Sequence, residues 1–354
     1  MQSEYMHWAK FKAPVRFPLT GSEVVHFRLD RFPISIADLD LDGASHPRYP
    51  PLRERIAERY KVTTNQVVAA DGTSMANFLA LAALIEPGDE VLIEYPGYEP
   101  LIGAAGFLGA SIRRFERKPS DAFRLDPSLI EAAFSPRTRL IVITNLHNPS
   151  SVLAEESDLR ALGTLAASVG ARVLVDEVYL DAAVPPRASA VHLGPEFVTT
   201  NSLTKVYGLS GLRCGWILAE PGLAERMWRL NDLFGVNQAH PAERLACIAF
   251  DRIDEVLGDN ASLLARNRRT FSDFLASRND LECAPAEHGI TAFPAWSGGD
   301  TQRLDDHLRQ HYDTSVVAGR WFEMPDHFRL GFYPHPDDFE EALSRLGRAL
   351  DDLK

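Results

Sequence analysis

A lysine set among small and hydroxyl residues is the first candidate for chemistry in this sequence. The segment 201–216 has the sequence NSLTKVYGLSGLRCGW, which places Lys205 just after a short apolar stretch. A lysine amine in a partly dry, cationic pocket has a lowered pKa and can form a Schiff base with a carbonyl group. Ser202 and Arg213 can both donate to a phosphate, the arginine as a two-pronged fork. The segment therefore predicts a Schiff-base lysine beside a phosphate-binding site.

An aspartate ends an otherwise apolar run in the segment 173–179, VLVDEVY. A carboxylate at the end of a strand points into the crevice where α/β folds bind their ligands. Asp176 could keep a pyridine nitrogen protonated there, which makes the ring a better electron sink. Tyr179, three residues later, could reach a phenolic oxygen on the same ring.

Three further segments follow predicted strands or open predicted helices. Asn148 stands before a proline and is therefore biased toward an extended conformation, which can aim its amide into a crevice. Gly72-Thr73-Ser74 opens a helix, where free backbone N–H groups and the helix dipole favour a phosphate. Tyr98 comes shortly after a strand and could stack on a flat ring. Each segment also has a plainer alternative: a surface lysine, a helix cap, an Asn-Pro turn or a core tyrosine.

Short apolar strands alternate with helices along the first two thirds of the chain, a pattern typical of helices on both faces of a sheet. We predict strands at 91–95, 140–145, 172–179, 197–202 and 217–219, and helices at 52–60, 75–85, 127–134 and 155–168. From about residue 250 the texture changes to a long Arg-rich helix, 251–276, then shorter elements and a last helix, 336–353. These patterns predict an α/β fold with a large domain, 46–250, and a smaller α+β domain formed by 1–45 and 251–354.

Composition narrows the class of protein. Among 354 residues, Lys plus Arg number 37 and Asp plus Glu 49, so the net charge of −12 argues against a nucleic-acid partner. The three cysteines form no CxxC pair, which predicts reduced thiols, no metal site and a cytoplasmic protein. No signal-peptide pattern and no apolar run of about 18 residues occurs, so we expect no membrane association.

The order of these motifs, from Tyr49 to Trp216 with a further match in HFRLGF at 327–332, resembles the class I/II aminotransferase family. That family belongs to the fold-type I enzymes that use pyridoxal 5′-phosphate (PLP), and its fold has a large PLP-binding domain and a smaller domain. The resemblance implies an aminotransferase that moves an amino group between an amino acid and a 2-oxo acid, usually as a homodimer.

The resemblance also assigns a role to each motif. Lys205 would carry PLP as a Schiff base and move the proton, Asp176 would pair with the pyridine nitrogen, and Tyr98 would stack on the ring. Residues that would contact the ring oxygen are Tyr179 and Asn148, and those that would bind the phosphate are Gly72, Thr73, Ser74, Ser202 and Arg213. Arg329, with Asn148, would bind the substrate α-carboxylate.

Some features depart from the family pattern. Tyr49 resembles a tyrosine that reaches the phosphate of the neighbouring subunit, but the spacer that follows it is several residues short. Thr204 replaces the usual serine before the lysine, and two serines follow the Asn-Pro pair at 148–149. Candidates for the substrate side-chain pocket are Arg16, His240, Phe293 and Trp296.

Two other functions fit the same residues. A PLP-dependent lyase or cyclising enzyme of the same fold, of the C–S lyase type for example, would use the same lysine, aspartate and tyrosine. A non-catalytic PLP-fold binding protein is a weaker alternative, because a pure binder needs neither Lys205 nor Asp176. An NAD-dependent enzyme is disfavoured, because no GxGxxG follows an early strand.

Overall fold

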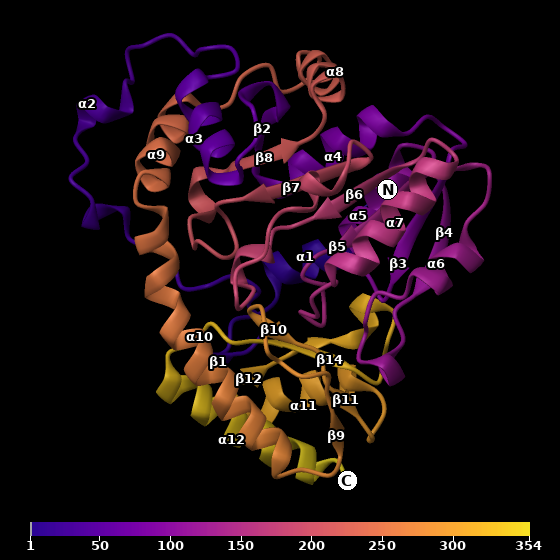
Figure 1. The fold of residues 1–354 in the computed structure, drawn as a ribbon. Coiled ribbons are helices and arrows are strands. Elements are labelled where there is room, and N and C mark those ends of the chain that lie inside the picture. Colours follow the sequence, from indigo (N-terminus) through magenta and orange to yellow (C-terminus); the bar gives the residue numbers. More distant parts are fainter. Residues whose placement is uncertain (1) are drawn as a thin grey trace.

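A seven-stranded sheet forms the centre of the computed structural model, which describes residues 2–354 (Figure 1). Its strands are β2 Val67–Asp71, β3 Glu90–Tyr95, β4 Ser111–Glu116, β5 Thr138–Thr144, β6 Arg172–Asp176, β7 Phe197–Ser202 and β8 Cys214–Leu218, in the order β2-β8-β7-β6-β5-β3-β4. The neighbouring strands from β7 to β4 in this order are all parallel, whereas β8 is antiparallel to both of its neighbours, β2 and β7. The predicted α/β fold with a mostly parallel sheet is confirmed.

Helices cover both faces of the sheet. They are α3 Pro50–Tyr60, α4 Gly72–Leu84, α5 Glu99–Phe107, α6 Pro127–Ala133, α7 Glu156–Ser168, α8 Pro221–Asn231 and α9 His240–Phe250. Side chains alternate between faces along β5: Leu140 and Val142 join the core under α4, and Ile141 and Ile143 join the core under α7. A strand buried on both faces must be apolar at every position, which explains the continuous apolar runs in the sequence.

The remaining chain forms a second layered region at the bottom of Figure 1. Its helices are α10 Ile253–Ala276, α11 Thr301–Tyr312 and α12 Pro336–Asp352, and its two-residue strands are β9 Leu281–Glu282, β10 Thr291–Ala292, β11 Ala295–Trp296, β12 Thr314–Ser315 and β13 Val317–Ala318, with β14 Phe328–Gly331. The N-terminal segment contributes α1 Glu4–Phe11 and β1 Phe17–Pro18, and β1 pairs with β12. Its short helix α2 Ile36–Leu39 instead lies against α9, at the upper left of Figure 1. The first part of the N-terminal segment therefore packs with the C-terminal part of the chain, and the domain division at residues 45 and 250 stays a proposal; Met1 lies outside the described residues.

Several predicted bounds were wrong. Strand β6 ends at Asp176 rather than at Tyr179, because the chain turns there and Leu180 N donates to Glu177 O at 2.9 Å. Strand β8 begins at Cys214, before the predicted 217. The edge strand β2 was not predicted, because the last three residues of its sequence VVAAD are alanine and aspartate, which strands disfavour.

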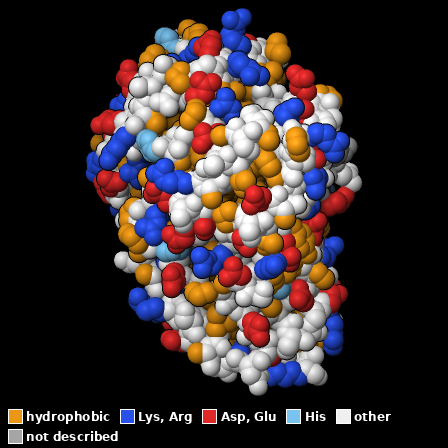
Figure 2. All heavy atoms as spheres, turned by 45° about the vertical axis from the view of Figure 1, so that its right-hand side comes forward, with side chains coloured by type: hydrophobic (Ala, Val, Ile, Leu, Met, Phe, Trp, Pro, Cys, Tyr) orange, Lys and Arg blue, Asp and Glu red, His pale blue; other side chains and the backbone are white. Residues whose placement is uncertain are grey.

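The surface carries charges of both signs. On the face shown in Figure 2, acidic and basic side chains are interspersed, and no large area has one sign. Among the described residues, none of the helices combines the length and the apolar character that crossing a membrane requires.

Candidate active site

A cavity of about 500 Å³ opens where β5, β6 and β7 end. Its walls are Met6, Lys10, Ser22, Glu23, Thr73, Ser74, Asn77, Tyr98, Thr144, Asn148, Asp176, Val178, Tyr179, Thr204, Lys205, Ser210 and Arg213. The carboxyl ends of neighbouring parallel strands meet at one edge of a sheet, which is why motifs far apart in the sequence converge here. A second cavity of about 600 Å³ adjoins the first and shares the walls Lys10 and Glu23 with it.

Lys205 follows β7 and is half-buried on the cavity wall. Its Nζ donates to Ser22 Oγ at 3.4 Å, and its carbonyl accepts from Val24 N at 3.0 Å. Burial lowers the pKa of the Lys205 amine, and the nearby carboxylates of Glu23 and Asp176 oppose that effect. An amine that loses its proton more readily is the form that attacks a carbonyl group.

Asp176 is the buried carboxylate of the site. Its Oδ2 accepts from Asn77 Nδ2 at 2.7 Å, its Oδ1 accepts from Val178 N at 3.0 Å, and Thr200 Oγ1 fixes the Asn77 amide by donating to Oδ1 at 2.6 Å. Burial raises the pKa of Asp176 to about 6, although these hydrogen bonds act in the opposite direction. A buried carboxylate of this kind gains stability from a cation, such as a protonated ring nitrogen.

The other end of the cavity has the groups that a phosphate needs. Helix α4 begins at Gly72 and has no acidic residue in its first turn, and Thr73 and Ser74 of that turn line the cavity together with Thr204, Ser210 and Arg213. The unpaired N–H groups at the start of a helix favour an anion. Thr73 Oγ1 donates to Ser202 Oγ at 2.7 Å, which places Ser202 behind the wall rather than on it.

Gly72 and Arg213 depend on each other at this end. Gly72 has a φ of 78°, and a Cβ at this position would lie 2.4 Å from Arg213 Nη2. The guanidinium can therefore cross the start of α4, where it donates to Asp71 O at 3.0 Å, only because residue 72 has no side chain.

Arg329 lies on β14 behind the cavity wall, with 1% of its surface exposed. Its Nη1 donates to Asn148 Oδ1 at 2.9 Å and its Nη2 to Tyr5 OH at 2.8 Å, while Nε has no partner. Among the side chains that the structure describes, which exclude those of Met1, Leu29 and Asp259, no carboxylate forms an ion pair with Arg329. A buried positive charge without a counter-ion is costly, so this arrangement favours binding of an anion.

Tyr5 reaches Arg329 from helix α1, which Figure 1 shows between the two layered regions. Its ring lies 6.0 Å from Tyr98, 6.0 Å from Trp321 and 5.8 Å from Phe322, measured between centroids. A buried tyrosine removes about 150–250 Å² from water, which corresponds to about 4–6 kcal/mol. This exceeds the roughly 1.5–3 kcal/mol of a hydrogen bond to a charged group, so packing holds Tyr5 in place.

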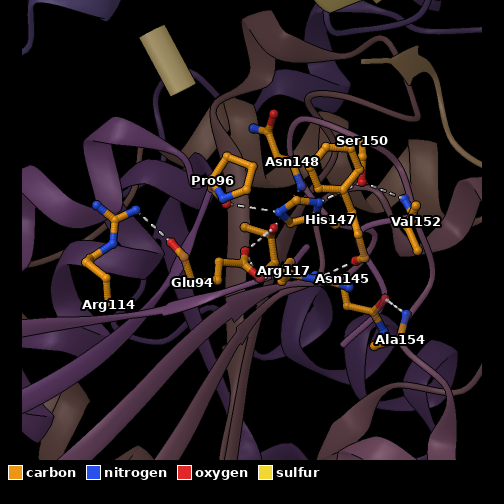
Figure 3. A network of polar contacts seen from close by, with 12 residues as sticks. Glu94, Pro96, Arg114, Arg117, Asn145, His147, Asn148, Ser150, Val152 and Ala154 are labelled. Carbon is orange, nitrogen blue, oxygen red and sulfur yellow. Dashed lines mark hydrogen bonds and ion pairs between the residues drawn. The ribbon is translucent and has the colours of Figure 1, made fainter. Parts of the chain in front are cut away.

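A buried polar network supports Asn148 from below (Figure 3). Asn148 N donates to Thr144 Oγ1 at 2.8 Å, and Thr144 Oγ1 donates to Glu94 Oε1 at 2.6 Å. Glu94 is paired with Arg117 at 3.0 Å, and both are buried. Because a carboxylate only accepts, the Thr144 hydroxyl must point its hydrogen at Glu94, which leaves a lone pair for Asn148 N.

His147 joins the same network to the segment that carries Tyr98. Its Nε2 must donate to Pro96 O, 3.0 Å away, because a carbonyl only accepts, and its Nδ1 then accepts from Ser150 Oγ at 2.6 Å. Burial, with the nearby Arg117, lowers the pKa of His147 well below its usual value, so the ring is neutral. The loops of Asn148 and Tyr98 are therefore held together.

We expect Glu94→Gln to lower the free energy of unfolding by about 3–5 kcal/mol, because it leaves Arg117 buried without a counter-ion. Urea unfolding measures this loss. Glu116→Gln, on the neighbouring strand β4 and exposed, is the control and should change stability by less than about 0.5 kcal/mol. A loss for Glu94→Gln as small as that of the control would contradict the importance of this buried pair.

The structure places most of the predicted residues together and separates a few. Eight line the cavity: Thr73, Ser74, Tyr98, Asn148, Asp176, Tyr179, Lys205 and Arg213. Tyr179 donates its hydroxyl to Ser22 O at 3.1 Å. The ring of Tyr49 packs on His46 and His240, and a role at the phosphate of a neighbouring subunit stays a prediction. The candidates for the substrate side-chain pocket do not line this cavity: Arg16, His240, Phe293 and Trp296.

Other residues were missed. Met6, Lys10, Ser22 and Glu23 come from the N-terminal segment and form the wall that the cofactor motifs leave free. Asn77 had a signal in the sequence, since it is a polar residue within the otherwise apolar run MANFLALAAL. Tyr5 had none.

The residues present fit PLP. The site combines a lysine of lowered pKa, a buried carboxylate, and a helix start where only glycine leaves room for Arg213. When bound, PLP would withdraw electrons from the carbon that carries the amino group of the substrate.

Comparisons with known proteins agree with this site. A family model described as aminotransferase class I and II matches residues 40–346. The chain is 32% identical over 304 residues to a capreomycidine synthase of Streptomyces vinaceus, which covers 84% of this chain and 78% of that protein.

Two solved structures have the same fold. A PLP-dependent aminotransferase from Streptococcus suis superimposes with a TM-score of 0.92 at 22% identity, covering 99% of this chain and 97% of that one. A PLP-dependent cyclase, OrfR, superimposes with a TM-score of 0.88 at 26% identity, again covering 99% and 97%. The chain belongs to the class I and II aminotransferase family, and its cofactor is pyridoxal 5′-phosphate.

Proposed function

We propose that this protein is an aminotransferase, which moves the amino group of an α-amino acid to a 2-oxo acid. The observation that carries the proposal is Arg329, a buried cation that has no counter-ion and is one hydrogen bond from Asn148 on the cavity wall. An α-carboxylate would supply the missing charge, and Arg329 would thereby orient the substrate with its Cα toward Lys205.

Each residue has a proposed role in this reaction. Lys205 Nζ would take the proton from Cα, since burial lowers its pKa. Asp176, held by Asn77 and Val178 N, would keep the ring nitrogen of the cofactor protonated. The start of α4 with Ser74, Thr204, Ser210 and Arg213 would bind the phosphate, and Tyr98 would lie against the ring.

A cyclising or eliminating reaction is the second candidate. It is favoured by the 32% identity to a capreomycidine synthase and by the 26% identity to a solved PLP-dependent cyclase. The same Lys205 and Asp176 would serve this reaction, because it also begins with loss of the Cα proton.

One experiment separates the two candidates. The purified protein with PLP is mixed with single amino acids, without any 2-oxo acid. The panel includes L-arginine, L-aspartate and L-alanine and, because cyclisation and elimination must expel a β-substituent, L-serine and O-acetyl-L-serine. A transaminase should release one 2-oxo acid per site and then stop until pyruvate or 2-oxoglutarate is added. A cyclising or eliminating enzyme should turn over repeatedly without an acceptor on amino acids with a leaving group; a cyclised product should keep the substrate nitrogen, and elimination should release it as ammonia. If no amino acid of the panel is converted, both candidates fail.

We also propose that the protein is a homodimer in the cytoplasm. Large apolar side chains are exposed on the segment between α8 and α9, at Leu233, Phe234 and Val236, and such a surface favours a partner chain. Light scattering should give twice the 39.3 kDa of one chain, and a mass of one chain would contradict the dimer.

A further inference from the structure

Helix α1 brings a tyrosine hydroxyl to the arginine that we propose as the carboxylate site. Arg329 Nη2 donates to Tyr5 OH at 2.8 Å, so in this contact the tyrosine oxygen accepts. The hydrogen of the same hydroxyl has no acceptor within residues 2–354, although only 5% of Tyr5 is exposed. Arg329 Nε lacks a partner as well. Buried donors without acceptors are rare in folded proteins, and donors gathered around one point favour an anion there.

Packing keeps this hydroxyl where it is. Tyr5 lies between Tyr98 of the sheet region and Trp321 and Phe322 of the C-terminal region. The helix is also fastened at its start, where Ser3 bonds Glu99, and next to Tyr5, where Tyr98 OH donates to Met6 Sδ at 3.4 Å. A carboxylate that approaches Arg329 would therefore meet the hydroxyl rather than displace it.

We propose that Tyr5 is a substrate-binding residue, whose hydroxyl accepts from Arg329 and donates to the α-carboxylate of the bound amino acid. This inference rests on the proposed role of Arg329. It adds to the carboxylate site a side chain from the N-terminal segment, which lies 324 residues from Arg329 in the sequence. It also narrows the substrate class to compounds with a free, negatively charged α-carboxylate, because an ester or an amine offers no anion to the two donors.

The substitution Tyr5→Phe, which removes only the hydroxyl group, tests the proposal. The PLP-loaded wild type and Tyr5→Phe are titrated with pyruvate and with methyl pyruvate, two probes that differ by the charge of the carboxylate. Thermal unfolding and calorimetry give the dissociation constants without any turnover. We expect Tyr5→Phe to weaken pyruvate binding by about 10- to 100-fold, the loss of a hydrogen bond to a charged group, and to leave methyl pyruvate binding unchanged.

Ser3→Ala is the matched control. It removes the hydroxyl that caps the same helix, with its bond to Glu99 and the bond that it accepts from Met6 N at 3.1 Å, but leaves the contact between Tyr5 and Arg329. It should change the binding of both probes to the same small extent. Equal losses for the two probes in Tyr5→Phe would show a merely structural role, and tighter pyruvate binding would show that Tyr5 competes with the carboxylate; either result overturns the proposal.

The proposed carboxylate site and the proposed reaction can fail separately. If the wild type binds pyruvate no better than its ester, the carboxylate site itself is wrong and Tyr5 falls with it. If pyruvate binding depends on Tyr5 but no amino acid is converted, the proposed reaction fails and the binding site remains.

Discussion

Lys205→Ala is expected to abolish the visible absorbance of the protein with PLP and to lower turnover by about 10⁴-fold or more. The reason is that, in the proposed reaction, one amine would both attach the cofactor and move the Cα proton, so a single substitution would remove two functions. Absorbance spectra and the rate of 2-oxo acid release from the best amino acid measure the two losses.

Lys12→Ala is the control for this prediction. Burial lowers the pKa of Lys12 as well, but Lys12 lines only the adjoining cavity, and its Nζ donates to Ala9 O at 2.7 Å. Lys12→Ala should therefore keep the absorbance band. If it loses the band and Lys205→Ala keeps it, the roles of the two lysines are reversed.

Asp176→Asn is expected to lower turnover by about 100-fold or more, because the ring nitrogen would lose its charged partner. The same substitution should change how stability depends on pH in the cofactor-free protein. In the folded state the pKa of Asp176 is about 6, against 3.8 for an ordinary aspartate. The folded protein therefore binds more protons than the unfolded chain between these values, and its stability falls as the pH rises through them.

The size of this effect follows from the pKa values. The pKa of Asp176 in the folded state is about two units above that in the unfolded state, and each unit corresponds to about 1.4 kcal/mol. The buried Asp176 should therefore lower the free energy of unfolding by about 3 kcal/mol at neutral pH. The difference in unfolding free energy between wild type and Asp176→Asn should fall by that amount from about pH 4 to pH 7. Urea unfolding across this range measures it.

Glu177→Gln is the control, because burial raises the pKa of Glu177 to about 8 and the same measurement should then show a fall that continues above pH 7. A pH-independent difference for Asp176→Asn would contradict the buried, cation-seeking carboxylate.

Residues that follow strands were predictable from the sequence. Asp176 ends a strand, Lys205 and Asn148 come shortly after one, and parallel strands bring such residues to one edge of a sheet. The start of α4 was predictable for another reason, because Gly72 and the two hydroxyl residues after it come directly before an apolar run that indicates a buried helix.

Contacts across the chain were not predictable. Tyr5 reaches Arg329 over 324 residues, and Glu94 supports Asn148 through Thr144, so their roles depend on tertiary packing rather than on local pattern. The wall formed by Met6, Lys10, Ser22 and Glu23 was missed for the same reason. Phe293 and Trp296, two candidates for the substrate side-chain pocket, are buried in the C-terminal region.

The central claim, that Lys205 carries the cofactor, is tested most directly by chemical reduction. The protein with PLP is treated with borohydride, which fixes a lysine-bound cofactor irreversibly, and the modified peptide is identified by mass spectrometry. The expected result is one modified residue per chain, Lys205, within the peptide that follows β7. Modification of a different lysine, or none in a protein that binds PLP, would contradict it.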